Sequence, residues 1–371
     1  MPKVQLALVA PSLNILGGQA VQAQRLLDAW RGSPEIDAWL VPVNPVPPPG
    51  LRFTRRVKYL RTVVNELIYL PLLVRELARA DVVHVFSASY SSFLLAPLPA
   101  MIVARALGRP VVLNYRSGEA PDHLRRSAIA RAAIARADRN VVPSRFLKNV
   151  FASFGIDATV IPNIVDLDRF QFRLRDPLRP RLLSTRNFEG LYNVGCTLRA
   201  FRIVQEAHPH ASLTLVGGGR EDARLRELAR DLGLRNVTFT GRVHPGEIAD
   251  FYRDHDVYVQ SPNIDNMPTS VLEAYASGLP VVSTEAGGIP AILTHGIHGL
   301  LAPLHDHERL ASHVLALLDD RALVRRVTLA ARDACESYTW SSVRDEWLRL
   351  YRSVLADSAY APAVLSRHAR Q

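Results

Sequence analysis

The chain has 371 residues, of which 48% are hydrophobic and 22% charged, so it has an ordinary globular composition and exceeds the length of one core. Its net charge of +10 suggests an anionic partner, while two cysteines supply neither a disulfide framework nor paired metal ligands. No helix-turn-helix, zinc-finger or RNP-like pattern occurs, so we expect no nucleic-acid partner. The start, MPKVQLALVAPS, resembles a strand more than a signal peptide, and we expect a cytoplasmic protein.

The first half of the sequence alternates short apolar runs with helical patterns. The runs are VQLALVAP, AWLVPVNP, DVVHVF, PVVLNY, NVVPS and TVIPN. Because they are continuous and not alternating, they are typical of parallel strands buried on both faces. Residues 85–104 carry no charge, yet their prolines and serines favour a buried strand and helix over a membrane span.

A second series of strand-like runs begins at Arg181. Its members are RLLST, SLTLVGGG, VTFTG, VYVQS, PVVST and LLAP, again separated by helical patterns. Two successive βα series predict an α/β protein with two doubly wound domains. We place the domains at residues 1–170 and 171–340, with a charged, proline-containing linker between them. Residues 341–371 are expected to form a helix that packs back on the first domain, and a tail.

Glycine clusters follow three of the predicted strands. They are Gly17 and Gly18, the triplet at 217–219, and the pair at 287–288. Ligands of open α/β sheets bind beyond the carboxyl ends of the strands. Glycine lets a phosphate approach the backbone, and the next helix N-terminus supplies N–H groups. Tight turns also need glycine, but three clusters favour a phosphate-bearing ligand in a cleft.

One segment, NMPTSVLEAYASGLPVVSTEAGG at residues 266–288, combines several such signals. A helix starts within residues 266–270, directly after a strand, and Glu273 lies one turn further in. The helix dipole favours an acid there, and its carboxylate can accept hydrogen bonds from a sugar diol. Glu273 alone could be a simple helix-start acid. The complete string of acid, helix start, Glu, Gly-Leu-Pro, strand and Gly-Gly favours a ligand site.

This string resembles the family 4 glycosyltransferases, which are retaining enzymes of the GT-B architecture. The resemblance covers nearly the whole chain: VIPNIVDLDRF is similar to the interdomain segment, RLLSTRNF to the first donor-domain strand, and GGQA to the acceptor-side glycine loop. It implies two Rossmann-like domains facing a central cleft. It also implies transfer, with retention, of a sugar from a nucleotide diphosphate donor to an acceptor held by the first domain.

The same resemblance implies roles for individual residues. Glu273 would bind the ribose hydroxyls, and Arg186 would pair with the diphosphate, where a guanidinium can bind in a bidentate manner. Asp265 would face the transferred sugar, so Asp265 and Arg186, with His123, are the catalytic candidates. The other donor-side candidates are Gly217, Gly241, Arg242, Val243, Asn266, Met267, Pro268 and Thr269. Those on the acceptor side are Gly17, Gly18, Arg116 and Glu119.

Three departures from the family pattern stand out. Asp265 replaces the first glutamate of the usual pair, which shortens the side chain by one methylene. A lysine expected a few residues after the arginine is missing, and Tyr192 or Asn193 is found instead. The histidine often found after the fourth strand is replaced within NYRSGEA, where Arg116, Glu119 and the nearby His123 are the substitutes. If His123 is not catalytic, we expect it on the surface.

No metal and no cofactor beyond the donor is expected. Asp254, His255 and Asp256 imitate the DxD metal motif of another glycosyltransferase fold, but they form a helix-end turn before a strand. The resemblance also implies that two protein carboxylates at glycosidase spacing are not required, because the leaving phosphate would help to deprotonate the acceptor.

Residues 53–77 and 123–139 both combine basic and apolar residues in a helical pattern. Such helices suit an anionic membrane surface, which would fit a lipid-linked or envelope glycan acceptor and peripheral attachment to the inner face of the membrane. A solvated face over a buried apolar stripe is the alternative explanation.

Two rival functions are weighed against the transferase. A dinucleotide-dependent oxidoreductase needs GxGxxG after the first strand, and PSLNILGGQAVQ does not supply it. A catalytically inactive partner that binds a nucleotide sugar stays open because of the changes at Asp265 and Tyr192.

Overall fold

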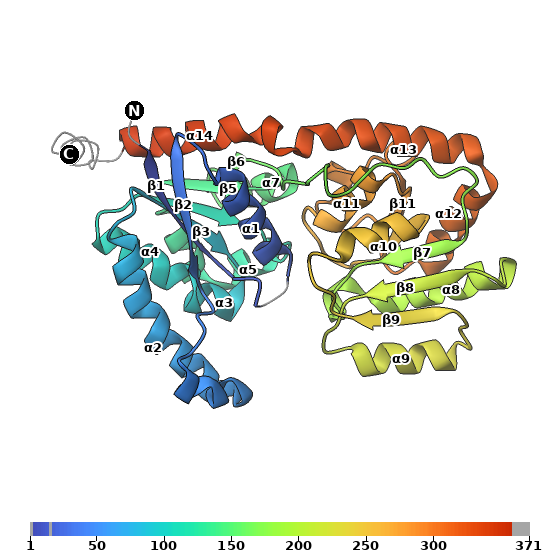
Figure 1. Ribbon diagram of the computed structural model, residues 1–371, viewed down its shortest axis with the longest axis horizontal. Helices are drawn as coiled ribbons and strands as arrows, with labels where there is room; N and C mark the ends of the chain where they lie inside the picture. Colours follow the sequence, from blue (N-terminus) through green and yellow to red (C-terminus); the bar gives the residue numbers. More distant parts are fainter. Residues whose placement is uncertain (1–2, 15–16, 358–371) are drawn as a thin grey trace. The chain divides into compact units, whose positions relative to one another are not determined.

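A computed structural model of the protein describes residues 3–14 and 17–357 and divides the chain into two α/β units (Figure 1). The first unit runs to Ile161 and resumes at Arg344, and the second is Pro162–Val343. Each is built on a parallel six-stranded sheet whose strand order does not follow the sequence. The prediction of two doubly wound α/β sheets is therefore confirmed.

The sheet of the first unit has the order β2-β1-β3-β4-β5-β6. Its strands are β1 (Val4–Ala10), β2 (Ile36–Pro42), β3 (Val82–Ser87), β4 (Val111–Tyr115), β5 (Arg139–Val142) and β6 (Thr159–Val160). The helices are α1 (Gly18–Trp30), η1 (Pro49–Arg56), α2 (Lys58–Leu77), α3 (Tyr90–Leu95), α4 (Pro97–Ala106), α5 (Ala120–Arg126), α6 (Ala128–Ile134) and α7 (Arg145–Ser153). Every residue of β3 and β4 is buried, as their continuous apolar runs predict.

The sheet of the second unit has the order β12-β11-β10-β7-β8-β9. Its strands are β7 (Arg181–Ser184), β8 (Ser212–Val216), β9 (Val237–Gly241), β10 (Val257–Gln260), β11 (Val281–Thr284) and β12 (Leu300–Ala302). The helices are η2 (Gly190–Tyr192), α8 (Val194–Ala207), α9 (Asp222–Asp231), α10 (Ile248–Asp254), α11 (Thr269–Ser277), η3 (Ile289–Ala291), α12 (His307–Asp319), α13 (Arg321–Cys335) and η4 (Glu336–Tyr338).

The first unit ends at Ile161, earlier than the expected boundary after residue 170. The residues that follow are fixed within the second unit. The side-chain amide of Asn163 donates to the carbonyl of Met267 at 2.6 Å. Phe170 is buried, and its ring lies 5.5 Å from that of Tyr252. These contacts give residues 162–170 to the second core.

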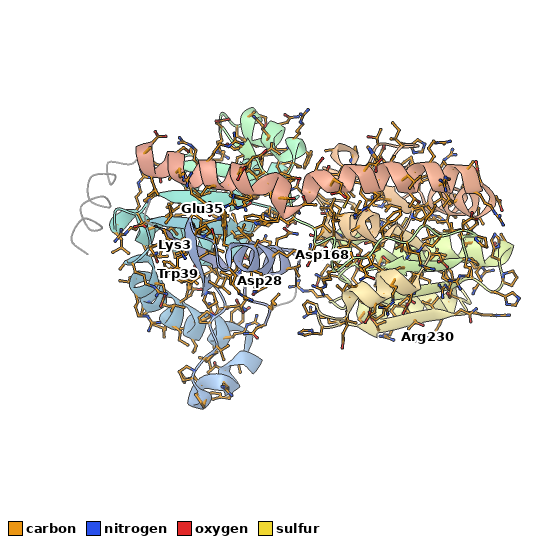
Figure 2. The ribbon with its side chains drawn as sticks, turned by 45° about the horizontal axis from the view of Figure 1, so that its top comes forward. Lys3, Asp28, Glu35, Trp39, Asp168 and Arg230 are labelled. Carbon is orange, nitrogen blue, oxygen red and sulfur yellow. The ribbon has the colours of Figure 1, made fainter. Side chains whose placement is uncertain are left out.

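The last helix, α14 (Trp340–Asp357), belongs to the first unit from Arg344 onward. The Tyr351 hydroxyl lies 2.8 Å from Nδ1 of the buried His84 in β3, and the Trp347 ring stacks on Tyr351. Arg344 donates to Oε1 of Glu35 at 2.8 Å (Glu35 is labelled in Figure 2). Burial lowers the pKa of His84 to about 3, so its ring is neutral.

The uncharged stretch at residues 85–104 forms the end of β3 followed by α3 and α4. This confirms the strand-and-helix interpretation. Within residues 3–14 and 17–357, no helix combines the length and apolar character needed to span a membrane.

The segment expected to be a linker, residues 170–180, is tied to the turn between α10 and β10 by Asp256. This carboxylate is almost fully buried and accepts from Nε of Arg179 at 3.1 Å and Nε of Arg181 at 3.0 Å. Arg173 and Arg175 lie 3.5 and 3.7 Å from its other oxygen. A buried carboxylate needs such partners. The DxD-like turn therefore has a structural role, and the segment is not a free linker.

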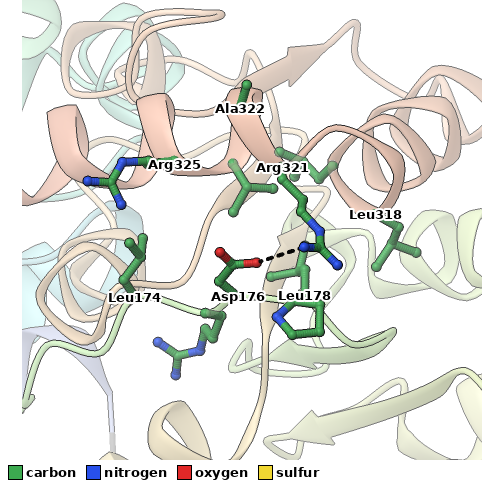
Figure 3. Close-up of a pocket in the computed structure, with 11 residues that line it drawn as sticks. Leu174, Asp176, Leu178, Leu318, Arg321, Ala322 and Arg325 are labelled. Atoms are coloured by element: carbon green, nitrogen blue, oxygen red, sulfur yellow. Dashed lines mark ion pairs between the residues drawn. The ribbon is translucent and has the colours of Figure 1, made fainter.

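A pocket of about 270 Å³ flanks the same segment (Figure 3). Aliphatic side chains of residues 174–178 and of α12 and α13 form most of its wall, and Asp176 pairs with Arg321 at 3.7 Å. It contains none of the predicted site residues.

Candidate functional site

Helix α11 begins at Thr269, inside the range expected from the sequence, and Pro268 precedes it. It ends at Gly278, whose φ of 72° suits glycine, and a Cβ there would lie 2.6 Å from the carbonyl oxygen of Arg173. All residues from Ser270 to Ser277 are buried. Glu273 is thus a carboxylate in an otherwise uncharged, enclosed helix, with 7% of its surface exposed.

Glu273 shares a hydrogen bond with Tyr252 of α10. The Tyr252 hydroxyl also lies 2.7 Å from Oγ1 of Thr185 and 3.3 Å from the carbonyl oxygen of Ser270. Burial, with the added effect of the Glu273 charge, raises the pKa of Tyr252 well above its ordinary value, so the phenol remains a neutral donor. A buried charge needs such a donor. Tyr252 is therefore one of the groups that hold the Glu273 carboxylate.

Arg186 follows β7 and is buried beside Asp265. Its Nη2 pairs with the Asp265 carboxylate, and its Nη1 donates to Oγ of Ser270 at 3.1 Å. The guanidinium stands 4.1 Å from the centre of the Tyr192 ring. Burial works to lower the pKa of Arg186, but Asp265 and nearby tyrosines raise it above its usual value. Its Nε is enclosed and has no hydrogen-bond partner within the part of the chain that the structure describes.

The glycines of the second unit allow close packing between its loops. A Cβ on Gly217 would lie 2.1 Å from the carbonyl oxygen of Arg186, and one on Gly219 would lie 2.3 Å from that of Phe188. A Cβ on Gly287 or Gly288 would lie 2.2 Å from the carbonyl oxygen of Asp265 or Asn266, respectively.

A side chain at any of these positions would collide with the neighbouring loop, so glycine is required there. The Gly288 N–H also donates to the Asp265 carbonyl at 3.0 Å. They therefore place the backbone of Arg186 and Asp265, and phosphate contact at these two clusters stays a prediction.

The other donor-side candidates lie around the same strand ends. Asn266 and Met267 are buried, and Thr269 is the first residue of α11. Gly241 ends β9, with a φ of 74°, and its carbonyl accepts from the Gly217 N–H at 3.0 Å. Arg242 and Val243 follow directly. The structure thus brings these candidates to the carboxyl ends of β7, β8, β9 and β10, within one unit.

Sequence reasoning missed the buried polar side chains beneath Arg186 and Glu273. Gln260 at the end of β10 accepts from the Tyr258 hydroxyl at 3.3 Å and donates to Oγ of Ser283 at 3.1 Å. Ser270 lies between Gln260 and Arg186. Gln260 ends a strand in which the other residues are apolar or aromatic, and such a buried amide is the signal that could have revealed this network.

The acceptor-side candidates belong to the first unit. Gly17 precedes α1 and Gly18 begins it, and a Cβ on either would meet no atom of the described residues within 4 Å, unlike the glycines at 217, 219, 287 and 288. Arg116 and Glu119 follow β4 and are partly exposed. These residues lie after the carboxyl ends of β1 and β4, where ligands of parallel sheets bind.

His123 lies in α5 and is 1% exposed, so the expectation that it otherwise lies on the surface is wrong. Its Nδ1 is 2.8 Å from the Tyr115 hydroxyl, which is also 2.9 Å from Oγ of Ser89. Burial lowers the pKa of His123 and so favours the neutral ring, and the charge of Asp122 only partly opposes this lowering. The aromatic rings of Tyr90 and Phe93 pack around it.

Comparison with known families also divides the chain into two parts. A family described as "Glycosyltransferase Family 4" matches residues 17–169, and one described as "Glycosyl transferases group 1" matches residues 168–334. A GDP-mannose-dependent alpha-mannosyltransferase of Mycobacterium tuberculosis (strain CDC 1551 / Oshkosh) is 30% identical over 301 residues, covering 74% of this chain and 73% of the relative. The chain belongs to glycosyltransferase family 4.

Two further relatives are matched over a smaller share of their length. The sulfoquinovosyl transferase SQD2 of Arabidopsis thaliana is 27% identical over 312 residues, which is 76% of this chain and 59% of that protein. A phosphatidyl-myo-inositol mannosyltransferase of Mycobacterium leprae (strain TN) is 32% identical over 209 residues, which is 54% of this chain and 55% of that protein. The chain thus spans between half and three-fifths of these two family members.

Solved structures confirm the GT-B fold. Sucrose-phosphate synthase from Thermosynechococcus elongatus matches 96% of this chain and 100% of its own, with a TM-score of 0.75 at 19% identity. Anabaena Alr3699/HepE, solved with UDP and glucose, matches 94% and 100% with a TM-score of 0.74 at 16% identity.

Proposed function

We propose that the protein transfers a hexose-like sugar from a nucleotide diphosphate donor to an acceptor, with retention at the anomeric carbon. The observation that carries the proposal is the pairing of Arg186 with Asp265 next to the start of α11, with Glu273 one turn further along. The alpha-mannosyltransferase relative and a HepE structure solved with UDP-glucose support this choice of donor class.

In this proposal each group has a separate task. Arg186 binds the diphosphate, and its unpaired Nε supplies a donor that no described residue uses. The backbone N–H groups of residues 266–269, at the start of α11, add positive potential beside it. Glu273 accepts from the ribose hydroxyls, and Asp265 faces the transferred sugar. The leaving phosphate helps to remove the acceptor proton.

The proposal is tested first by thermal unfolding with a panel of uridine and guanosine diphosphate sugars. A ligand at a hundred times its Kd stabilises the fold by about 2.7 kcal/mol. Stabilisation by none of these nucleotides contradicts donor binding. Nucleotide release on mixing the stabilising donor with cell-extract acceptors then separates a transferase from an inactive nucleotide-sugar-binding partner, which would bind without turnover.

We expect turnover to need no divalent metal. The DxD-like carboxylate Asp256 is held by arginines, and the charge of a bound diphosphate would be met by Arg186 and helix N–H groups. Residues 3–14 and 17–357 contain no group of three His, Cys, Asp or Glu side chains that could hold a metal ion. Transfer rates measured with and without a chelator should agree, and loss of turnover that manganese restores would contradict the expectation.

We also propose that the first unit attaches to an anionic membrane surface through α2, so that the acceptor is lipid-linked or part of an envelope glycan. One face of α2 is exposed and apolar, with 78% of Tyr59 and 68% of Leu67 accessible to solvent. We call this face the α2 stripe; its residues are Tyr59, Val63, Leu67, Leu70 and Val74. The opposite face, which includes Tyr69, Leu73 and Leu77, is buried in the core.

The residues around the start of the α2 stripe are basic. Figure 1 shows η1 and the first turns of α2 projecting from the sheet of their unit. The sequence has no acidic residue between Asp37 and Glu66, and five basic residues at positions 52, 55, 56, 58 and 61. Exposed apolar side chains next to a sequence segment rich in basic residues fit an anionic lipid surface. Residues 123–139 offer no such continuous face, because their expected helix is interrupted at Ser127 between α5 and α6.

Co-sedimentation with vesicles tests this attachment. We expect binding to vesicles with anionic lipids and little binding to neutral ones, because each basic residue near the surface contributes about 1 kcal/mol. The double variant Val63→Gln and Leu67→Gln should bind several-fold less. Ile297→Gln, at an exposed apolar position of the second unit, is the matched control. Equal binding to neutral and anionic vesicles, or no effect of the double variant, would rule out the α2 stripe.

Tyr252→Phe tests the positioning of Glu273. Removing the hydroxyl takes a donor from the Glu273 carboxylate, so we expect nucleotide diphosphate affinity to fall about three- to tenfold, since a hydrogen bond to a charged group contributes about 1.5–3 kcal/mol in full. Titration calorimetry on the folded variant measures it. Tyr275→Phe, in the same helix as Glu273 but hydrogen-bonded to the Ile292 carbonyl, is the control. Similar affinity losses in both variants would indicate a general packing effect.

A further inference from the structure

Arg116 is positioned at the carboxyl edge of the first sheet by the pairing of β3 with β4. Phe86 and Ser87 lie opposite Asn114 and Tyr115, so Arg116 is the first residue beyond the paired strands. Its guanidinium lies 5.2 Å from the centre of the Phe86 ring. Its Nη1 donates to Oδ1 of Asn114 across a long 3.4 Å, and its Nη2 is enclosed without a hydrogen-bond partner among the described residues.

Two other enclosed arginines, Arg175 and Arg186, have most of their N–H groups or their charge matched. Arg175 donates to backbone carbonyls of His255, Arg173 and Tyr252 at 2.9, 2.7 and 2.7 Å, and Arg186 pairs with Asp265. Arg116 forms no ion pair with any residue in 3–14 or 17–357. A partly desolvated guanidinium needs an anion or several acceptors. The described part of the protein does not supply such a partner for Arg116.

The nearby acids do not fill this role. Asp122 accepts from Nε of Arg126 at 2.8 Å and from the Tyr90 hydroxyl at 2.6 Å. Burial, followed by repulsion from Asp122, raises the pKa of Glu119, so this carboxyl behaves as a group without a cationic neighbour. Burial also disfavours the charged form of Arg116 and lowers its pKa to about 9, and no nearby carboxylate of the described residues offsets this lowering.

Arg116 also lies close to a second acceptor-side element. The side-chain amide of Gln19, in the first turn of α1, donates to the carbonyl of Ser87 at 3.0 Å. The start of α1 and the Arg116 side chain therefore both contact the last two residues of β3. This edge holds Gly17 and Gly18, which leave open space, and the first turn of α1 has no acidic residue.

We propose that Arg116 binds an anionic group, a phosphate or a carboxylate, that the acceptor carries beside its reacting hydroxyl. The inference rests on the proposed sugar transfer and adds the chemical class of the acceptor. The planar guanidinium matches such a group in a bidentate manner. The anion can belong to a soluble polyol phosphate or to the headgroup of a phospholipid, and the two sources share this chemistry.

Calorimetric titration tests the site with the donor side already saturated by UDP. Glycerol 3-phosphate is the soluble probe, and glycerol is its uncharged counterpart. We expect glycerol 3-phosphate to bind at least tenfold more tightly than glycerol. Arg116→Gln should remove this preference, and Arg116→Lys should keep part of it. Arg125→Gln, at an exposed arginine of α5, should leave it unchanged.

A second arm uses vesicles of phosphatidylglycerol or phosphatidylinositol against neutral phosphatidylcholine. A drop caused by Arg116→Gln in this arm alone would identify the anion as a lipid headgroup, and a drop in the soluble arm would identify a free polyol phosphate. Equal binding of glycerol 3-phosphate and glycerol in the soluble arm, together with no effect of Arg116→Gln on vesicle binding, would overturn the proposal.

Two controls separate this site from the donor site. If UDP saturation abolishes binding of glycerol 3-phosphate, the anion sits where the donor diphosphate binds, and the assignment to Arg116 is overturned. UDP affinity should be the same in wild type and Arg116→Gln, which also shows that the variant is folded. If UDP does not bind at all, the proposed function fails, and titration of glycerol 3-phosphate without nucleotide still reads Arg116 by itself.

Discussion

Glu273→Gln should lower the affinity for a bare nucleotide diphosphate by about one to two decades. The amide keeps the size of the side chain but removes its charge, and hydrogen bonds to a charged group contribute about 1.5–3 kcal/mol. Because about 1.4 kcal/mol corresponds to a tenfold change in Kd, the loss of one such interaction with the ribose gives this range. The carboxylate is enclosed in α11 and contacts Tyr252, so a water molecule cannot easily take over its hydrogen bonds to the ribose.

Titration calorimetry with UDP and GDP measures the effect, with the folded fraction determined for each variant. Glu285→Gln is the matched control, because Glu285 is an exposed glutamate directly after β11. If Glu273 is only a structural acid, the substitution changes the stability of the fold and leaves affinity per folded molecule alone. Equal affinities for wild type and Glu273→Gln would therefore show that residues 266–288 have been misinterpreted.

The sequence predicts most of this half of the site because local patterns determine it. Continuous apolar runs specify buried parallel strands, and the helix start after β10 specifies where N–H groups point. The spacing of Asp265, Glu273 and the Gly-Gly pair places them on one strand-helix-strand unit, which the structure contains as β10, α11 and β11. Family membership follows from the same segment.

Contacts between segments distant in sequence could not be predicted in this way. Asp256 is separated by 75 residues from Arg181, and their hydrogen bond turns an apparent metal motif into a structural one. Tyr252 belongs to an ordinary helix pattern, and only folding brings its hydroxyl to Glu273. The glycines at 217–219 and 287–288 were correctly placed at strand ends, but what fills the space above them is backbone from another loop.

His123 shows the same limit for a single side chain. Its sequence surroundings, HLRRSAIARAA, are rich in arginine and predict a solvated position. The ring is buried because β4 supplies Tyr115 and α3 supplies Phe93 on the side of α5 that faces the core. Exposure of one residue depends on which face of a short helix packs inward, and α5 has only seven residues from which to read a period.

Asp265→Asn should separate transfer from nucleotide binding. In the structure the Asp265 carboxylate pairs with Arg186, the group proposed to hold the diphosphate, so the two anions compete for one guanidinium. Removing the charge of Asp265 ends this competition, and we expect bare nucleotide affinity to be unchanged or higher. Transfer should fall by about tenfold or more, because a carboxylate proposed to face the sugar contributes most when charge develops there.

Arg186→Gln is the opposing variant, since it should weaken nucleotide binding and transfer together. Calorimetry with UDP or GDP gives the binding side of the comparison, and the rate of nucleotide release in the presence of donor and acceptor gives the transfer side. We expect the asparagine variant to keep the local backbone, because the Gly288 N–H bonds the main-chain carbonyl and an amide oxygen can still accept from the Asn266 N–H, as Oδ1 of Asp265 does at 2.8 Å. Loss of nucleotide affinity in Asp265→Asn would mean that Asp265 holds Arg186 in its binding position, in which case the ion pair assists the donor and does not compete with it.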